Sequence, residues 1–297
     1  MTSVSQINKF IDYLVKTKKS SVNTVSAYER DLEGFNIYLM AESKDILDVS
    51  GDDIDRYKSA MNSKGFSPSS VSRAMSSIRG FYKYLTFSGD IKKDPSSKVK
   101  NEKIEKKDFA ILTSKEVELL LAQPDIKTIK GLRDKAMLEV MYATGLKVTE
   151  LISLKVSDIN TKLGFVVCHG DDGKKSDRTI FLYPAAVKSV KEYLDTARKI
   201  LNTEDSDDLF LNINGFGITR QGFWKILKAY VESAGINKTI TPHTLRHSFA
   251  THLLENGADI NDIKEILGHS DIASTQVYAN YIKGKIKDSY LKFHPRA

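Results

Sequence analysis

A lysine-rich stretch at residues 92–107 (KKDPSSKVKNEKIEKK) divides this chain into two parts. The stretch contains one proline and very few apolar side chains, so it cannot supply a hydrophobic core and is typical of a linker. The 297 residues of the chain are enough for two domains, each with its own core. We therefore expect an N-terminal domain over residues 1–91, a basic linker over 92–110 and a second domain over 111–297.

Apolar side chains recur every three or four residues through the first 90 positions, which predicts four amphipathic helices. Ser50 resembles the start of a capping box before the third helix, and Ser67 with Pro68 forms an N-cap and first-turn pair before the fourth. The last two helices mix basic side chains with serines, which suits contact with phosphates, although a merely solvated helix face is the alternative. The candidate contacts on the fourth helix are Arg73, Arg79 and Lys83.

Two β-rich runs interrupt the helical pattern of the second part. Gly164–Cys168 and Arg178–Leu182 are separated by Gly170-Asp-Asp-Gly173, which is the turn chemistry of a hairpin. Later helices are expected at roughly 184–200, 219–234, 243–256, 259–267 and 285–292. The predicted fold class is therefore mainly α with a small antiparallel β-sheet.

The helix expected at 219–234 begins with two polar side chains that are candidates for contact with phosphates. They are Arg220 and Gln221. Phe223 and Trp224 follow on the same helix, and both are expected to pack in the core.

The charge of the chain favours a polyanionic partner. It has 45 Lys+Arg against 38 Asp+Glu, a net charge of +7, and a pI of about 9.1, although many enzymes are equally basic. No run of eighteen apolar residues and no leader-like N-terminus are present, so we expect neither a membrane span nor secretion. Cys168 is the only cysteine and cannot form an internal disulfide, which fits a reducing cytoplasm.

Four side chains suited to phosphate chemistry lie close together near the C-terminus. They are His243, Arg246, His269 and Tyr278. His243 and Arg246 are three residues apart, so they share one face of the expected helix, while apolar residues occupy another face. A guanidinium beside an apolar face suits a phosphate clamp, and a tyrosine hydroxyl can act as a nucleophile. This set provides the groups needed to cleave a phosphodiester by tyrosine attack.

With these motifs, the sequence resembles the tyrosine site-specific recombinases, and among them the Xer type. The resemblance also covers Gly131-Leu-Arg-Asp-Lys-Ala-Met-Leu138, Ala143-Thr-Gly-Leu-Lys-Val-Thr-Glu-Leu151, Thr219-Arg-Gln-Gly-Phe-Trp224 and the closing Phe293-His-Pro-Arg-Ala297. It implies a helical core-binding domain and a mixed α/β catalytic domain that form a clamp around double-stranded DNA. It also implies a homotetramer, or a heterotetramer with a second recombinase, on the DNA sites, and leaves a DNA translocase open as a further partner.

The resemblance assigns roles to the C-terminal set. Tyr278 would attack the scissile phosphate and form a 3′-phosphotyrosyl bond that conserves the bond energy, so neither a metal nor another cofactor is implied. Arg246 would bind the non-bridging oxygens, His243 would assist positioning or proton transfer, and His269 would donate to the phosphate. Tyr281 is the alternative nucleophile.

Two positions depart from the family pattern. The Ala-Thr-Gly-Leu motif normally continues with arginine, but here it continues with Lys147, which keeps the charge and loses the two-pronged contact. The family hairpin normally has a lysine right after its glycine, but here Gly170 is followed by Asp171. Either Lys174 or Lys175 could replace the general acid. Lys174 is the candidate for that role, and Lys175 is also a candidate DNA contact.

Functions of different classes therefore stay open. One is a recombinase that cuts and rejoins DNA, either to resolve chromosome or plasmid dimers or to move a mobile element. Another is a DNA-binding, architectural protein that keeps this fold with impaired strand cleavage, which Lys147 and Asp171 would explain. A helical transcription factor would leave the C-terminal set unexplained. The spacing of His243, His247 and His252 does not suit a metal site.

Overall fold

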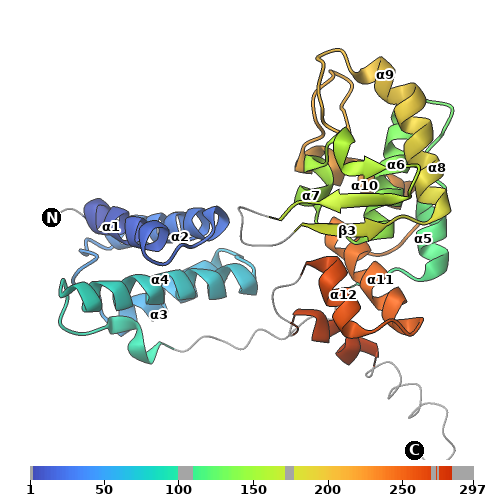
Figure 1. Ribbon diagram of the computed structural model, residues 1–297. Helices are drawn as coiled ribbons and strands as arrows, with labels where there is room; N and C mark the ends of the chain where they lie inside the picture. The colour runs from blue at the N-terminus through green and yellow to red at the C-terminus, as the bar shows by residue number, and fades with distance from the viewer. Residues whose placement is uncertain (1–2, 100–109, 171–176, 269–271, 273, 283–297) are drawn as a thin grey trace, which may run out of the picture. The chain divides into compact units, whose positions relative to one another are not determined.

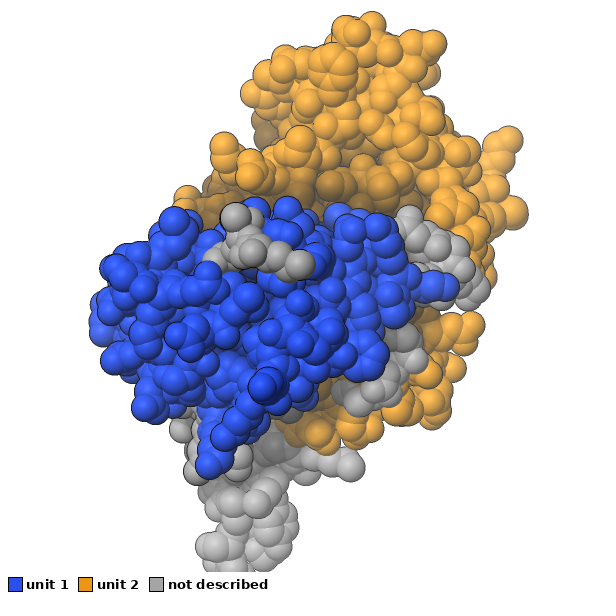
Figure 2. Space-filling view, turned by 90° about the vertical axis from the view of Figure 1, so that its left-hand side faces the viewer, with its two compact units in different colours: residues 1–107 blue, residues 108–297 orange. Residues whose placement is uncertain are grey.

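The computed structural model describes residues 3–99, 110–170, 177–268, 272 and 274–282 (Figure 1). The chain divides into two compact units, residues 1–107 and 108–297, which Figure 2 distinguishes by colour. Each unit has its own hydrophobic core. Among the residues that the structure describes, no helix is both long enough and apolar enough to cross a bilayer.

The described part of unit 1 forms four helices and one short 3-10 turn. These elements are α1 (Ser3–Lys16), α2 (Val22–Ala41), α3 (Gly51–Ser63), α4 (Pro68–Ser88) and η1 (Pro95–Lys98). The aromatic rings of Phe10, Phe35 and Phe81 are almost fully buried where the apolar helix faces meet. The hydroxyls of Ser50 and Ser67 accept backbone N–H groups at the starts of α3 and α4, so both predicted caps are confirmed.

The first part of the expected linker belongs to unit 1. Val99 is buried in the core of that unit, and its carbonyl accepts a hydrogen bond of 2.9 Å from Arg79 on α4. Asp94 caps η1 by accepting the Ser96 backbone N–H at 2.8 Å. Residues 95–99 are therefore folded against the helices, unlike the free linker expected from residue 92. A single apolar side chain creates no periodicity, so the sequence pattern did not reveal this contact.

A buried carboxylate joins the loop after α2 to the start of α3. The side chain of Asp53 is 3% exposed and forms ion pairs with Lys44, at 2.6 Å, and with Arg56. It also accepts the backbone N–H of Ser50 at 2.9 Å, which completes the capping box. Burial tends to raise the pKa of Asp53, but the hydrogen bonds from Lys44, Ser50 and Arg56 outweigh burial and hold this pKa well below its usual range.

Unit 2 surrounds a central helix. Its described elements are α5 (Ser114–Leu121), α6 (Ile129–Thr144), α7 (Val148–Ser153), η2 (Val156–Asp158), β1 (Ile159–Asn160), β2 (Phe165–Cys168), β3 (Arg178–Phe181), α8 (Pro184–Glu192), the π-helical turn η4 (Tyr193–Ala197), α9 (Arg198–Leu201), α10 (Arg220–Ser233), α11 (Pro242–Glu255) and α12 (Ile260–Leu267). Residues 274–282 are also helical.

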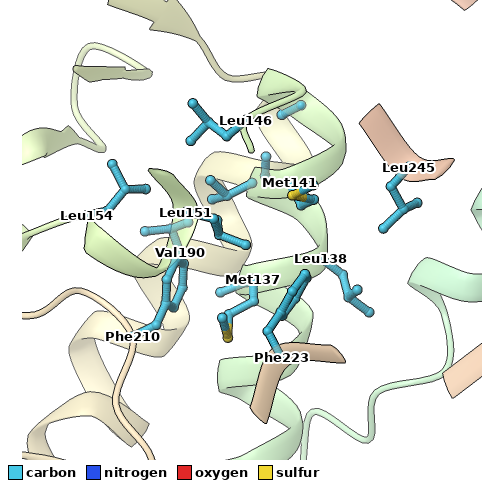
Figure 3. Close-up of a cluster of buried hydrophobic side chains, with 14 of the residues drawn as sticks. Met137, Leu138, Met141, Leu146, Leu151, Leu154, Val190, Phe210, Phe223 and Leu245 are labelled. Atoms are coloured by element: carbon cyan, nitrogen blue, oxygen red, sulfur yellow. The ribbon is translucent and has the colours of Figure 1, made fainter. Parts of the chain in front are cut away.

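Helix α6 is buried on several sides. Met137, Leu138 and Met141 have no exposed surface, and Figure 3 shows them among apolar side chains from several other elements. Those neighbours include Leu151, Leu154, Val190, Phe210, Phe223 and Leu245. A helix with apolar residues around much of its circumference is expected at the centre of a domain. Packing therefore fixes the position of the end of α6, from which the chain continues through Gly145 to Lys147.

The small sheet is antiparallel in the order β1-β2-β3. Val166 pairs with Ile180 and Cys168 with Arg178, so the predicted hairpin is confirmed. Strand β1 was not predicted, because its two residues are too short to produce an alternating pattern. The turn at 171–176 lies outside the described residues, and Arg178 is the first residue of β3.

Replacing Asp53 with asparagine should lower the free energy of unfolding of unit 1 by about 2 kcal/mol, because the ion pairs of a buried carboxylate are lost. The loss is limited because Lys44 and Arg56 are partly exposed and can be solvated by water. A carboxyl with a depressed folded pKa stabilises above its unfolded pKa of about 3.9, and this stability is lost as the pH falls below that value. The variant should therefore lose less stability on acidification than the original chain.

Amide hydrogen exchange in α3 and α4 would measure both effects. Asp55→Asn, at an exposed position of the same helix, is the matched control. Equal protection in the two variants would contradict the stabilising role of Asp53.

Candidate active site

The guanidinium of Arg246 is buried where three helices of unit 2 meet. Its side chain comes from α11, and the residue is 3% exposed. One terminal nitrogen donates to the carbonyl of Gly145 at the end of α6, and the other donates to the carbonyl of Leu267, at the end of α12, at 2.7 Å. Carbonyls at helix C-termini lack partners within their own helix and have a partial negative charge. These contacts fix both the position and the orientation of a positive charge.

Two glycines permit this close approach. Gly145 has a φ of +59°, and a Cβ there would lie 2.4 Å from the ring of Phe249. Gly268 has a φ of +62°, and a Cβ there would lie 2.9 Å from the guanidinium of Arg178. Both positions require a left-handed backbone that favours glycine. The helix ends that accept Arg246 therefore depend on glycine at these two positions.

A second arginine forms hydrogen bonds with residues next to the Arg246 site. Arg178 on β3 donates to the carbonyl of Ile266 and to the carboxylate of Glu150 on α7, both at 2.8 Å. Glu150 also accepts the backbone N–H of Lys147 at 2.8 Å. Burial tends to raise the pKa of Glu150, but the hydrogen bonds from Arg178 and Lys147 lower this pKa below its usual value. This brace joins the hairpin, the start of α7 and the end of α12.

Neither Arg178 nor Glu150 was predicted as a site residue from the sequence. The side chains of both residues are 9% exposed. Arginine and glutamate are rarely buried to this extent unless they form an ion pair. The only local signal was an acidic residue three positions after Lys147, which suits the N-terminal turn of a helix. The sequence could not show that its partner comes from a strand 28 residues later in the chain.

Positive charges converge on His243. This residue lies in the first turn of α11, whereas Arg220 begins α10 and Lys147 is the N-cap residue of α7. Burial lowers the pKa of His243, and the charges of Arg246, Arg220 and Lys147 lower this pKa further. Positive charges that act on the same group repel one another, and an anion beside them would relieve the repulsion. The structure thus brings these sequence-predicted residues together in an arrangement suited to phosphate.

Tyr278 lies beside the same cluster. Its side chain is 2% exposed and packs against Phe249 and Leu267. Its hydroxyl is 2.9 Å from Nδ1 of His247, a contact that the sequence analysis did not predict. Burial raises the pKa of the tyrosine, and the charge of Arg246 opposes this rise. A hydroxyl that can act as a nucleophile is therefore within electrostatic reach of the buried guanidinium.

Several of the candidate residues fall outside the described parts of the chain. They are His269, Lys174 and Lys175, together with Asp171 of the hairpin turn. His269 directly follows Gly268, the residue at the end of the braced helix α12.

The candidate DNA contacts in unit 1 differ in their surroundings. Arg73 makes two hydrogen bonds, of 3.0 and 2.8 Å, to the buried carboxylate of Asp31. Arg79 donates to the carbonyl of Val99, whereas Lys83 is exposed. Arg73 and Arg79 thus stabilise unit 1, and contact with DNA stays a prediction for all three.

Helix α10 presents polar residues to solvent at its start. Arg220 and Gln221 are exposed, and the hydroxyl of Thr219 caps the helix. Phe223 is buried as expected, but Trp224 is 45% exposed, so its expected place in the core is wrong. Adjacent helical residues point about 100° apart, which prevents both rings from entering the same core.

The described part of the chain contains no group of three or more His, Cys, Asp or Glu side chains that could hold a metal ion. His247 contacts Tyr278, and His252 contacts the hydroxyl of Tyr142 at 2.8 Å. His247 and His252 therefore contact two different tyrosines.

Comparisons with known protein families cover both units. The family described as "Phage integrase family" matches residues 110–284. The family described as "Phage integrase, N-terminal SAM-like domain" matches residues 7–89. The first match alone spans more than half of the chain.

Curated relatives match over almost their whole length. A protein named "Tyrosine recombinase XerD" from Listeria innocua is 45% identical over 296 residues, which cover 98% of this chain and 99% of the relative. A protein of the same name from Oceanobacillus iheyensis is 44% identical over 295 residues and covers 98% of both chains.

Solved structures share the fold. The XerH site-specific recombinase bound to a palindromic difH substrate aligns with a TM-score of 0.76 at 19% identity, covering 95% of this chain and 83% of that one. The Tn1549 transposon integrase in complex with a circular intermediate DNA aligns with a TM-score of 0.76 at 22% identity, covering 94% of each chain. The chain therefore belongs to the phage integrase family and is a Xer-type tyrosine recombinase, a site-specific recombinase that acts on DNA.

Proposed function

We propose that Tyr278, Arg246, His243 and Lys147 form the catalytic centre at which this recombinase cuts and rejoins DNA. The main support is that Tyr278 lies in the same buried cluster as Leu267, whose carbonyl accepts a hydrogen bond of 2.7 Å from Arg246. The charge of Arg246 also acts to lower the pKa of Tyr278. The charges of Arg246 and Lys147 also reach His243. A nucleophile beside fixed positive charge suits attack on a phosphodiester, where negative charge builds up on the oxygens in the transition state.

The proposed reaction is a transesterification. The Tyr278 oxygen attacks the scissile phosphorus, the bond between phosphorus and the 5′-oxygen breaks, and a 3′-phosphotyrosyl ester forms. The tyrosine passes its proton to a general base, for which His243 is our candidate, and the departing 5′-oxygen gains a proton from a general acid, for which Lys174 is our candidate. In the reverse step, a 5′-hydroxyl of the partner strand attacks the phosphotyrosyl bond and releases Tyr278. The covalent intermediate conserves the bond energy, so strand joining needs no ATP.

In this proposal Lys147 supplies charge where the family usually has arginine. Its backbone N–H is held by Glu150, which in turn is held by Arg178. The ammonium acts on both His243 and Glu150, which supports a place inside the cluster. A lysine is a compact charge that makes single contacts, whereas arginine binds two phosphate oxygens at once. We therefore infer that the centre is competent but slower than one with arginine at this position.

We propose that His269 completes the centre and that the DNA backbone is contacted by Arg220, Gln221, Lys83 and Lys175, together with Arg73 and Arg79. The likeness to XerD relatives favours resolution of chromosome dimers in the cytoplasm, by four protomers on two DNA sites. A heterotetramer with a second recombinase and control by a DNA translocase are the finer forms of this proposal. The competing function is a DNA-binding protein with impaired cleavage, which Lys147 and Asp171 favour.

Tyr278→Phe should abolish covalent attachment to DNA and leave binding intact, because only the nucleophilic oxygen is removed. Nicked suicide substrates that contain the host's recombination site would trap the adduct, which denaturing gels would measure. Tyr281→Phe is the control, and it should retain the adduct. Loss of the adduct in Tyr281→Phe alone would show that Tyr281 is the nucleophile, and binding without any adduct in the unaltered chain would favour the competing function.

Lys147→Arg should speed adduct formation by about tenfold, because a planar guanidinium can bind two phosphate oxygens. Single-turnover trapping at saturating protein would measure the rate. Arg246→Lys, the reverse change at the other cation, should slow the reaction by about 10²–10³-fold. A faster reaction in both variants would contradict the different roles that we assign to these positions.

Arg220→Ala should weaken binding to DNA about equally for all sequences and reduce the slope of log affinity against log salt by about one, because one phosphate contact is lost. Fluorescence anisotropy at several salt concentrations would measure this slope. Lys188→Ala removes an exposed charge on α8, 78% exposed at the side chain, and serves as the control. Equal slopes in the two variants would argue against contact between Arg220 and DNA.

A further inference from the structure

Helix α11 holds a second histidine against the proposed nucleophile. His247 follows Arg246 directly and lies one turn after His243. Its Nδ1 is 2.9 Å from the Tyr278 hydroxyl, and the centres of the two rings are 5.4 Å apart. This is a direct contact with the atom that would attack phosphorus. None of the roles proposed above for the catalytic centre uses it.

The imidazole of His247 is neutral at neutral pH. Burial lowers its pKa to about 4, and the nearby His243 and Arg246 contribute to the decrease. A neutral imidazole has one N–H and one nitrogen lone pair, so it can form a directional hydrogen bond with a hydroxyl. It is too weak a base to keep the proton of a tyrosine whose pKa is raised. The contact therefore suits orientation of the hydroxyl rather than storage of its proton.

The two partners come from separate parts of the fold. His247 is on α11, which begins at the capped residue Thr241 and whose Arg246 is bonded to the ends of α6 and α12. Tyr278 is on the helix at 274–282 and belongs to a buried apolar cluster that also contains Phe249 and Leu267. Apolar packing can hold a ring in place, but it does not set the direction of a hydroxyl. A hydrogen bond to a ring nitrogen can set that direction.

We propose that His247 is a positioning residue for strand cleavage, which holds the Tyr278 hydroxyl through Nδ1 beside the charge of Arg246. The inference rests on the proposed role of Tyr278 as nucleophile. A reacting atom held near its target loses less orientational freedom on the way to the transition state. The same helix thus contributes a phosphate-binding residue, Arg246, and the group that aims the nucleophile.

The test compares two substitutions at His247. His247→Leu removes the hydrogen bond, whereas His247→Asn can place an amide atom near the position of Nδ1. We expect His247→Leu to slow single-turnover adduct formation by about 10–100-fold without changing DNA affinity, and His247→Asn to restore most of the rate. A merely structural role would give no such rescue at equal thermal stability.

His252→Leu is the matched control. His252 lies on the same helix and makes the same kind of contact, at 2.8 Å, with the hydroxyl of Tyr142. We expect this variant to keep the original rate of adduct formation. An equal loss of rate in His247→Leu and His252→Leu would overturn the proposal, because the effect would then come from a general loss of packing in α11.

Other outcomes also decide the question. A rate in His247→Leu equal to or above that of the unaltered chain would overturn the proposal and leave the role of Tyr278 intact. An unaltered chain that forms no adduct would overturn both. Nitrogen NMR of labelled histidine gives a readout besides activity, because the Nδ1 signal of His247 should change in Tyr278→Phe. An unchanged signal would show that the hydrogen bond is absent in solution.

Discussion

The buried guanidinium of Arg246 is the interaction on which the site depends. It bonds the carbonyl ends of α6 and α12 to α11, and it places a positive charge where only 3% of the residue remains exposed. A buried charge is tolerated only when its donors find partners, and helix C-termini provide carbonyls with partial negative charge. Removing the side chain would leave those carbonyls without this donor as well as removing the charge. Arg246 therefore both stabilises the packing of the three helices and supplies the positive charge of the proposed catalytic centre.

The end of α12 is held by two arginines from different elements. Arg178 bonds the carbonyl of Ile266, and Arg246 bonds the carbonyl of Leu267. Because Gly268 follows directly, the chain leaves this helix from a fixed point. The partner of Arg178, Glu150, also fixes the backbone of Lys147. The hairpin, the lysine that replaces the family arginine and the exit from α12 thus share one network of paired charges.

The basic residues of unit 1 cannot simply be counted as contacts for DNA. Arg73 neutralises the buried Asp31, and Arg79 bonds the carbonyl of Val99, so part of the positive charge stabilises the domain. An ion pair at a half-exposed site still leaves donors that can face a phosphate. The contribution of Arg73 and Arg79 to DNA binding therefore depends on where their side chains lie, which amino-acid composition does not reveal.

The sequence by itself indicated the described long helices and the hairpin, because periodicity, capping residues and turn chemistry are local patterns, and its motifs indicated the family. The helix expected at 285–292 lies outside the described residues. Residue spacing also identified Arg246, His243 and Tyr278 as candidates, and the resemblance to the family added Lys147. Only the tertiary structure decided which side chains meet: the brace between Glu150 and Arg178, the burial of Val99, and the contact of His247 with Tyr278. These contacts join residues distant in the chain, and their energy comes from burial and pairing that no local pattern records.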